Sequence, residues 1–326
     1  MHATVLGAGS WGTALAILLA RNGHRVTLWG RESEELHLTQ AARENLRYLP
    51  GFALPEEVAV VSSDHLEPCD LWVVAVPSYA VRGVMGFICG ERPLTVIASK
   101  GIEAGSAQLL CEVALEACPS ACAGLLSGPN LAVEIVRGVP TASVSAFADA
   151  SDAERVAVAF NCRTFRVYLS SDVRGVELAG ALKNVLAIAA GMSDGLGFGD
   201  NTKGALLARG LGEMVRLGLA MGGRMETFIG IAGVGDLFAT AASTLSRNYR
   251  VGRALAEGQS LPDALETVGQ TAEGVGTADC AGILARRHGV EMPVFEAVDA
   301  VLKGRLRPSD GVALLMERAP KPEISL

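Results

Sequence analysis

The sequence predicts a two-domain α/β protein, with a doubly wound sheet over residues 1–172 and an all-helical domain over residues 173–326. Three observations predict this fold. A glycine-rich turn joins the first strand to the first helix, and short apolar strands then alternate with helical segments. From Val173 onward the strands give way to long helical stretches rich in Ala, Leu and Gly. A chain of 326 residues is also too long for most single hydrophobic cores.

The glycine-rich turn has the pattern G-x-G-x-x-G, formed by Gly7, Gly9 and Gly12. Gly7 allows a tight turn, Gly9 lets the backbone approach a pyrophosphate, and Gly12 lets helix and strand pack closely. The flanking segments are a strand over residues 3–6, a helix over 13–22 and a second strand over 25–29. This βαβ context predicts a Rossmann-type dinucleotide-binding domain, with other nucleoside-binding Rossmann-like proteins as the alternative.

The tip of the second strand bears on which dinucleotide binds. An acidic residue there commonly holds the ribose 2′-hydroxyl of NAD, whereas this chain has Arg31 followed by Glu32. The guanidinium of Arg31 is suited to the 2′-phosphate of NADP(H). NADP(H) is therefore favoured, Glu32 keeps NAD(H) open, and a solvated loop charge is the alternative interpretation of Arg31.

Lys100 follows the fifth of eight expected strands, at the end where ligands bind in such sheets. Only five of the 28 basic residues are lysine. The compact ammonium of Lys100 suits a contact to an oxyanion or a carbonyl oxygen, with sequence drift as the alternative. The six strands after the second are expected over residues 58–61, 70–76, 94–98, 122–126, 141–144 and 164–168, with a helix near 152–161.

The second domain opens on an apolar helix, residues 176–191, that carries Lys183 and Asn184 in its middle. An unpaired buried ammonium is costly, so Lys183 must be paired, reach the surface or have a chemical role. Small residues lie beside it at helical spacing, which lets another backbone or a ligand approach that face. Glu177 is one candidate partner. Asp236, on a turn before a later helix, either pairs with Lys183 or caps that helix.

Further along, Ser246, Arg247 and Asn248 gather hydrogen-bond donors that suit a phosphate, although an exposed helix start is the plainer alternative. Two glycine-rich loops are expected, over residues 193–201 and, with Glu273, over 269–274. The expected helices lie over 206–219, 277–288 and 293–303, and the tail 319–326, with two prolines, is expected to be disordered.

Composition excludes several functional classes. The net charge is −7 and no long Lys/Arg cluster occurs, so we expect no nucleic-acid partner, although a local pocket can still bind a small anion. Seven cysteines without a C-x-x-C pair indicate thiols in a reducing cytosol, and the scattered histidines predict no metal site. Neither a signal peptide nor a stable membrane insertion is expected.

Taken together, seven stretches resemble the bacterial-type NAD(P)-dependent glycerol-3-phosphate dehydrogenases. They run in order across nearly the whole chain, at residues 7–14, 99–101, 127–129, 177–191, 233–237, 246–248 and 273–274. The resemblance implies reversible oxidation of sn-glycerol 3-phosphate to dihydroxyacetone phosphate, in a cytoplasmic enzyme that feeds phospholipid synthesis. It also implies a helical domain like that of 6-phosphogluconate dehydrogenase, a small phosphorylated substrate, and we expect a homodimer.

Site residues are carried over from the family by position. The glycine loop and the following residues would contact the cofactor: Gly7, Gly9, Ser10, Trp11, Gly12, Arg31, Tyr48, Lys100, Ala132, Arg247, Thr271 and Glu273. The substrate contacts would be Lys100, Gly128, Asn130, Lys183, Asp236, Ser246, Arg247 and Asn248. Lys183 would be the proton acceptor. Asn130 departs from the family, which commonly has Ser or Thr there, so that contact would use different atoms.

A lysine that acts as a base near neutral pH needs a lowered pKa. Apolar surroundings and nearby Lys100 or Arg247 would lower the pKa of Lys183, and Asp236 would oppose them. Two other functions remain open at this point. A related dehydrogenase of 3-hydroxy acids would need carboxylate donors in place of Ser246, Arg247 and Asn248, and a non-catalytic NAD(P)-binding sensor would not need Lys183.

Overall fold

The computed structural model describes residues 1–63 and 65–316. It forms two compact units, the first made of residues 1–99 and 108–173 and the second of residues 100–107 together with the chain from 174. The short segment that contains Lys100 therefore packs with the helical unit, although its neighbours in sequence belong to the sheet. The expectation for the tail at 319–326 lies outside the described residues.

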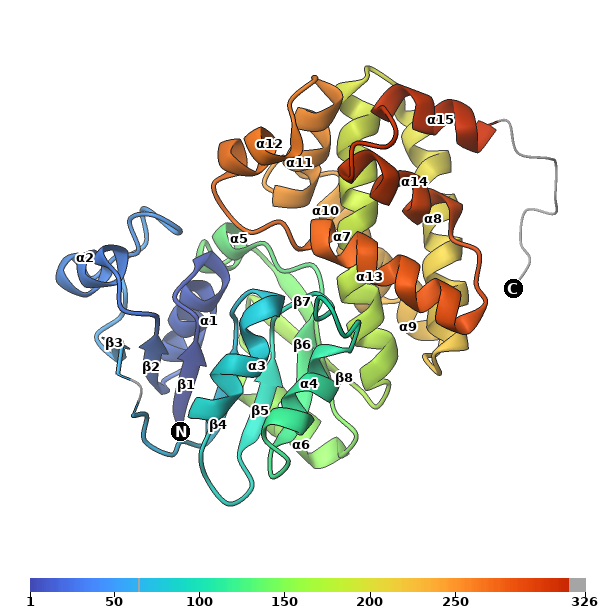
Figure 1. Cartoon of the computed structure of the whole chain (residues 1–326). Coiled ribbons are helices and arrows are strands. Elements are labelled where there is room, and N and C mark those ends of the chain that lie inside the picture. The colour runs from blue at the N-terminus through green and yellow to red at the C-terminus, as the bar shows by residue number, and fades with distance from the viewer. Residues whose placement is uncertain (64, 317–326) are drawn as a thin grey trace. The chain divides into compact units, whose positions relative to one another are not determined.

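The first unit is built on an eight-stranded sheet in the order β3-β2-β1-β4-β5-β6-β7-β8 (Figure 1). The strands from β3 to β6 in this order are parallel, β7 is antiparallel to β6, and β8 is parallel to β7. All eight predicted strands are confirmed, and the reversed pair β7–β8 makes the sheet mixed. The strands are β1 (His2–Leu6), β2 (Arg25–Trp29), β3 (Val58–Val61), β4 (Leu71–Val74), β5 (Leu94–Ile97), β6 (Cys122–Ser127), β7 (Thr141–Ala146) and β8 (Phe165–Ser170).

Helices form two groups around this sheet, in which α1 contacts α5 and α6, and α3 contacts α4. The helices are α1 (Ser10–Arg21), α2 (Glu34–Ala42), α3 (Val81–Val84), α4 (Leu110–Ala117), α5 (Ala132–Val136) and α6 (Ala150–Phe160). In β1, Ala3 and Val5 join the core cluster that includes α1, α5 and α6. Leu6, on the opposite face, is also fully buried. Burial on both faces explains why the central strands β4 and β5 are apolar almost throughout.

Apart from the segment 100–107, the described part of the second unit is built of helices, as predicted (Figure 1). They are α7 (Val173–Gly195), α8 (Asp200–Ala220), α9 (Met225–Ile229), α10 (Asp236–Ala241), α11 (Arg247–Ala256), α12 (Leu261–Val268), α13 (Glu273–His288), α14 (Pro293–Leu302) and α15 (Pro308–Met316). The expected loop at 193–201 is shorter than predicted and spans residues 196–199, because α7 continues to Gly195 and α8 already begins at Asp200. Gly195 serves close packing instead, since a Cβ there would lie 2.7 Å from the Cβ of Ala256.

The backbones of α7 and α11 touch where they cross. A Cβ on Gly191 would lie 2.0 Å from the carbonyl oxygen of Tyr249, and a Cβ on Gly252 would lie 1.9 Å from that of Ile188. Neither position tolerates a side chain without moving a helix. This crossing fixes the start of α11, which carries Arg247, relative to the middle of α7, which carries Lys183.

Among the described residues, α7 is the one helix long and apolar enough to cross a membrane. The apolar window of this helix is entirely buried inside the protein, as in the core helix of a folded domain.

Candidate functional site

The glycine loop of the first unit has the geometry of an anion-binding turn. Gly7 has φ of 121°, and a Cβ there would lie 2.6 Å from the carbonyl oxygen of Ala75. A Cβ on Gly12 would lie 1.8 Å from the carbonyl oxygen of Gly7, whereas a Cβ on Gly9 would meet no described atom within 4 Å. Gly7 and Gly12 are thus needed for the turn itself, and Gly9 leaves open space for a ligand. The loop fits the pyrophosphate of a dinucleotide.

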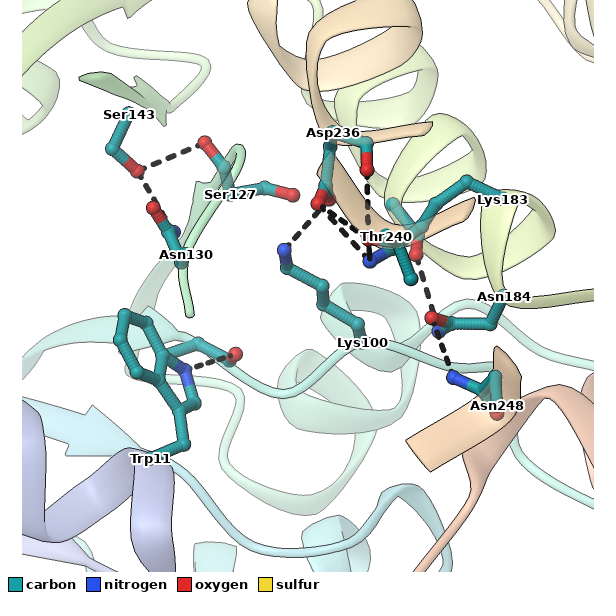
Figure 2. A network of polar contacts seen from close by, with 12 residues as sticks. Trp11, Lys100, Ser127, Asn130, Ser143, Lys183, Asn184, Asp236, Thr240 and Asn248 are labelled. Carbon is teal, nitrogen blue, oxygen red and sulfur yellow. Dashed lines mark hydrogen bonds and ion pairs between the residues drawn. The ribbon is translucent and has the colours of Figure 1, made fainter. Parts of the chain in front are cut away.

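Helix α1 begins at Ser10, three residues earlier than expected, and Gly9, with an extended backbone, is its N-cap. No side chain of the described residues caps this end, so the first amide groups of the helix stay available to a ligand. Ser10 and Trp11 therefore lie in the first turn. The indole Nε1 of Trp11 donates to the carbonyl oxygen of Ala98 at 2.9 Å, which ties this turn to the end of β5 (Figure 2).

A residue that sequence analysis did not assign holds the glycine loop. The amide Nδ2 of buried Asn45 donates to the carbonyl oxygen of Ala8 at 3.0 Å and to the hydroxyl of Thr13 at 2.8 Å. Its Oδ1 accepts from the backbone N–H of Tyr48 at 3.0 Å. Asn45 thus joins the glycine loop to Tyr48, an expected cofactor contact. No local sequence pattern indicated this role of Asn45.

Replacing Asn45 with Ala is expected to raise the KM for NADPH about tenfold, because its hydrogen bonds to Ala8 of the glycine loop and to Thr13 of α1 are lost. The KM for dihydroxyacetone phosphate should change less than about twofold. Steady-state kinetics measure both values. Asn22→Ala is the matched control, since Asn22 lies at the other end of α1 and donates to Ala159. Equal KM values for NADPH in the two variants would contradict a role for Asn45.

The remaining first-unit residues expected in the site lie on different elements. Arg31 is exposed just after β2, and Ala132 is the first residue of α5. The ring of Tyr48 lies 5.3 Å from the guanidinium of Arg47. Gly128 has φ of 148° and follows β6, where a Cβ would lie 3.0 Å from the carbonyl oxygen of Ala142. Glycine is therefore the residue that this turn accommodates.

Asn130 is held by its amide nitrogen and offers an acceptor. Its Nδ2 donates to the hydroxyl of Ser143 at 3.1 Å, and that hydroxyl donates to the carbonyl oxygen of Ser127 at 2.9 Å (Figure 2). The Oδ1 of Asn130 is buried and has no hydrogen-bond partner among the described residues. Such an orphaned acceptor indicates a site for a donor that completes it. The amide can thus accept a hydrogen bond from a ligand hydroxyl.

The second unit places two lysines on one carboxylate. The Nζ of Lys100 lies 2.7 Å from Oδ2 of Asp236, and the Nζ of Lys183 lies 3.0 Å from Oδ1 of the same residue (Figure 2). The side chain of Asp236 is 1% exposed, that of Lys183 7% and that of Lys100 16%. The pairing of Lys183 with Asp236, one of the two interpretations from the sequence, is confirmed. Two cations on one anion leave a net positive charge for an anionic ligand.

Asp236 is the first residue of α10 and not its cap, which is Gly235. A π-helical turn, Ile231–Gly235, leads into it. Thr240, one turn further on, was not expected in the site. Its hydroxyl accepts from Nζ of Lys183 at 2.5 Å and lies 2.7 Å from the backbone carbonyl oxygen of Asp236. Thr240 therefore fixes the position of the Lys183 ammonium.

The pKa of Lys183 is lowered from its ordinary value of 10.5 to about 8. Burial is the main cause, because it disfavours the charged ammonium. Asp236 raises the pKa and, more weakly, Lys100 and Arg247 lower it. These are the opposing influences that the sequence predicted. Near neutral pH the lysine can therefore both take up and release a proton.

Amide side chains link three helices beside Lys183. The Nδ2 of Asn248 donates to Oδ1 of Asn184 at 2.9 Å (Figure 2), and the Oδ1 of Asn248 accepts from the backbone N–H of Gly274 at 2.9 Å. A Cβ on Gly274 would lie 2.6 Å from the carbonyl oxygen of Asn184, so α13 approaches α7 closely. Asn248 thus fixes the helix geometry and has one amide hydrogen left for a ligand.

Arg247 lies at the start of α11 and is partly buried. Burial lowers the pKa of its guanidinium, and the Glu273 carboxylate opposes this effect. The hydroxyl oxygen of Ser246 caps the helix by accepting from the N–H of Tyr249 at 3.3 Å, so its proton stays available for donation. Glu273 is the first residue of α13, and Thr271 lies exposed just before it. The structure thus groups Arg247 with Ser246, Asn248 and Glu273.

All seven cysteines are free thiols, of which Cys111 and Cys280 are buried and Cys162 is exposed. Within residues 1–63 and 65–316, no group of three or more His, Cys, Asp or Glu side chains is arranged to hold a metal ion.

Known proteins resemble this chain over nearly its full length. The family model described as the N-terminus of NAD-dependent glycerol-3-phosphate dehydrogenase matches residues 2–153, and that of the C-terminus matches residues 172–313. The glycerol-3-phosphate dehydrogenase (NAD(P)+) of Acidovorax ebreus is 47% identical over 99% of both chains. That of Xanthomonas euvesicatoria is 45% identical over 98% of this chain and 95% of the relative.

The crystal structure of glycerol-3-phosphate dehydrogenase from Coxiella burnetii has the same fold, with a TM-score of 0.93. It is 39% identical in sequence, over 97% of this chain and 99% of that one. The family match spans both units described above. The chain therefore belongs to the NAD-dependent glycerol-3-phosphate dehydrogenase family.

Proposed function

We propose that this protein interconverts sn-glycerol 3-phosphate and dihydroxyacetone phosphate with NAD(P), and thereby supplies glycerol 3-phosphate for phospholipid synthesis. The observation that carries the mechanism is Lys183, a buried lysine with a pKa of about 8 beside Asp236. Membership of the family supports the reaction itself. Neither a 3-hydroxy-acid dehydrogenase nor a non-catalytic sensor accounts for the full-length match to these enzymes.

When bound, the nicotinamide cofactor supplies the hydride acceptor in oxidation and the hydride donor in reduction. Neutral Lys183 accepts the proton of the C2 hydroxyl during oxidation. In the reverse direction the Lys183 ammonium polarises the carbonyl oxygen and returns the proton to it. Asp236 and Thr240 keep Nζ in one place through both steps. Lys100 donates a second hydrogen bond to the substrate oxygen, since it shares Asp236 with Lys183.

We assign the phosphate of the substrate to Ser246, Arg247 and Asn248. The guanidinium gives a two-pronged contact, and the hydroxyl and the amide add short hydrogen bonds. Gly128 and Asn130 are the substrate contacts proposed in the first unit, where the free Oδ1 of Asn130 would accept from a substrate hydroxyl.

Replacing Arg247 with Ala is expected to raise the KM for dihydroxyacetone phosphate about 10- to 100-fold, because a charged hydrogen bond to the phosphate is lost. Initial-rate kinetics at saturating NADPH measure this KM. Arg253→Ala is the control on the same helix, since Arg253 is exposed and pairs with Glu257. An unchanged KM in the Arg247 variant would remove this residue from phosphate binding.

For the cofactor, we propose that the sheet unit is the dinucleotide-binding domain and that the helical unit is the catalytic domain. The proposed cofactor contacts in the sheet unit are Gly7, Gly9, Ser10, Trp11, Gly12, Arg31, Tyr48 and Ala132. Those in the helical unit are Lys100, Arg247, Thr271 and Glu273. Exposed Arg31 favours NADP(H), because its guanidinium is suited to the 2′-phosphate. We also propose that the protein is a cytoplasmic homodimer that does not insert into a membrane.

One spectrophotometric assay tests the function. Dihydroxyacetone phosphate is supplied with NADPH and then with NADH, and the loss of nicotinamide absorbance is followed. Turnover with higher kcat/KM for NADPH is the expected result. Turnover of 3-hydroxy acids in place of dihydroxyacetone phosphate, or tight NADPH binding without turnover, would overturn the proposal.

A further inference from the structure

The segment 100–107 carries Lys100 and is fastened to helix α13 of its own unit. The thiol of Cys280 donates to the carbonyl oxygen of Glu103 at 3.7 Å. Both terminal nitrogens of Arg287 donate to the carbonyl oxygen of Ser106, each at 3.3 Å. Cys280 is buried, and burial raises the pKa of its thiol to about 11, so it stays protonated and keeps its hydrogen for donation. Two points of this segment are thus bound to one helix.

The two anchors lie on the same face of α13. Cys280 and Arg287 are seven residues apart, which is about two helical turns. Glu273 lies another seven residues before Cys280, at the start of the same helix. The carboxylate of Glu273 acts on the guanidinium of Arg247. One face of α13 therefore connects the segment that carries Lys100 with the residues that we assign to phosphate binding.

The segment has a defined internal shape that can transmit this anchoring. The hydroxyl of Ser106 donates to a carboxylate oxygen of Glu103 at 2.7 Å, and the N–H of Ala107 donates to the carbonyl oxygen of Glu103 at 3.0 Å. Ala107 has φ of 56°, which a non-glycine residue adopts only where its surroundings impose it. Ile102 is only 2% exposed. These contacts give the segment one defined shape, with Lys100 at its beginning.

We propose that Cys280 and Arg287 are positioning residues for the reaction, which hold Lys100 on Asp236 through the segment 100–107. This inference rests on the proposed function, in which Lys100 and Lys183 act on the same substrate oxygen. Neither Cys280 nor Arg287 belongs to the stretches that resemble the family. Their effect reaches the reaction through the backbone of the segment.

Release of the segment has a predictable effect on Lys183. With Lys100 withdrawn, the charge of Asp236 acts on Lys183 alone, which favours the ammonium. One of the two cations that lower the pKa of Lys183 is also lost, and Arg247 remains. Both changes raise the pKa of Lys183. Less of the neutral base is then present near neutral pH, and the activity in the oxidation direction requires a higher pH.

The test uses the full-length enzyme with both anchors removed, Cys280→Ala with Arg287→Ala. In the pH profile of kcat for glycerol 3-phosphate oxidation, the acidic limb is expected to move about 0.5 pH unit or more to higher pH. The KM for dihydroxyacetone phosphate should rise about threefold to tenfold, because each exposed hydrogen bond contributes only a few-fold. The KM for NADPH should stay within about twofold. Arg286→Ala, which removes the same charge one residue earlier, is the control and should leave the pH profile unchanged.

Rescue separates positioning from general loosening of the fold. Cys280→Ser with Arg287→Lys keeps a donor at both anchors and should restore most of the wild-type pH profile. An acidic limb that stays in place when both anchors are replaced by Ala would overturn the inference. An equal shift of the acidic limb in Arg286→Ala and in the double Ala variant would also overturn the inference.

A second measurement makes the inference independent of turnover. Only five lysines occur in the chain, so ¹³C-labelled lysine resonances can be assigned and titrated one by one. Lys183 is expected to titrate near pH 8 in the wild type and at higher pH in the double Ala variant. An unchanged titration overturns the positioning role even if the enzyme is active. Absence of glycerol 3-phosphate turnover by the wild-type enzyme would overturn the proposed function. The titration of Lys183 would still test whether Cys280 and Arg287 position Lys100.

Discussion

Replacing Lys183 with Met is expected to lower kcat about a thousandfold in both directions, because the group that transfers the C2 hydroxyl proton is lost. Methionine has a similar length and keeps the buried space filled, so the loss does not come from a cavity. Asp236 keeps its second partner, Lys100, at 2.7 Å. The dissociation constant of NADPH should therefore change less than about twofold, as measured by fluorescence titration.

The pH profile of the wild type provides the second half of this prediction. Since the pKa of Lys183 is about 8, the kcat for oxidation should rise with pH through this value and then level off. The residual activity of the Met variant should lack this step. Lys303→Met is the control, because Lys303 is exposed and pairs with Asp279 and Asp299 on the surface. Near-normal turnover in the Lys183 variant would remove it from proton transfer.

Replacing Asp236 with Ala is expected to lower the free energy of unfolding by about 3 kcal/mol, because two lysines lose their common buried partner. The Lys100 and Lys183 ammoniums would then repel each other without compensation. Loss of Asp236 also removes the influence that raises the pKa of Lys183, so kcat in the reductive direction should fall as the ammonium is depleted. Urea denaturation measures the first effect and initial rates measure the second.

An exposed carboxylate of the same unit serves as the control for Asp236. Asp279 pairs with Lys303, and its side chain is 53% exposed. Asp279→Ala should therefore stay within about 1 kcal/mol of the wild type and keep its activity. If the two Ala variants are equally stable, the shared carboxylate does not hold the lysines together in solution.

Much of the fold could be predicted because its signals are local. Each short apolar strand and the turn at Gly7, Gly9 and Gly12 depend on residues next to one another in sequence. Glycine was misinterpreted where it serves packing, as at Gly195, because a glycine that ends a helix and one that admits a neighbouring helix look alike in a single sequence. The early start of α1 was missed for a related reason, since the glycine loop and the first helical turn overlap.

The candidate site was predictable as a set of residues but not as an arrangement. A lysine inside an apolar helix signals an unusual environment, and Lys183 was found in this way. Thr240 and Asn45 were missed because their partners, Lys183 and Thr13, are 57 and 32 residues away in sequence. Neither has a local pattern that distinguishes it from an ordinary helix threonine or turn asparagine. Long-range pairing of this kind requires the three-dimensional structure.

The interleaving of the two units limits how such an enzyme can be recombined. Residues 100–107 are encoded within the sheet half but pack with the helical half, against Cys280 and Arg287. A chimaera joined near residue 173 would bring the segment from one parent to an α13 from the other. We expect successful exchanges between homologues to need compatible residues at both anchors, so that these positions are inherited together with the segment, however far apart they lie in the gene.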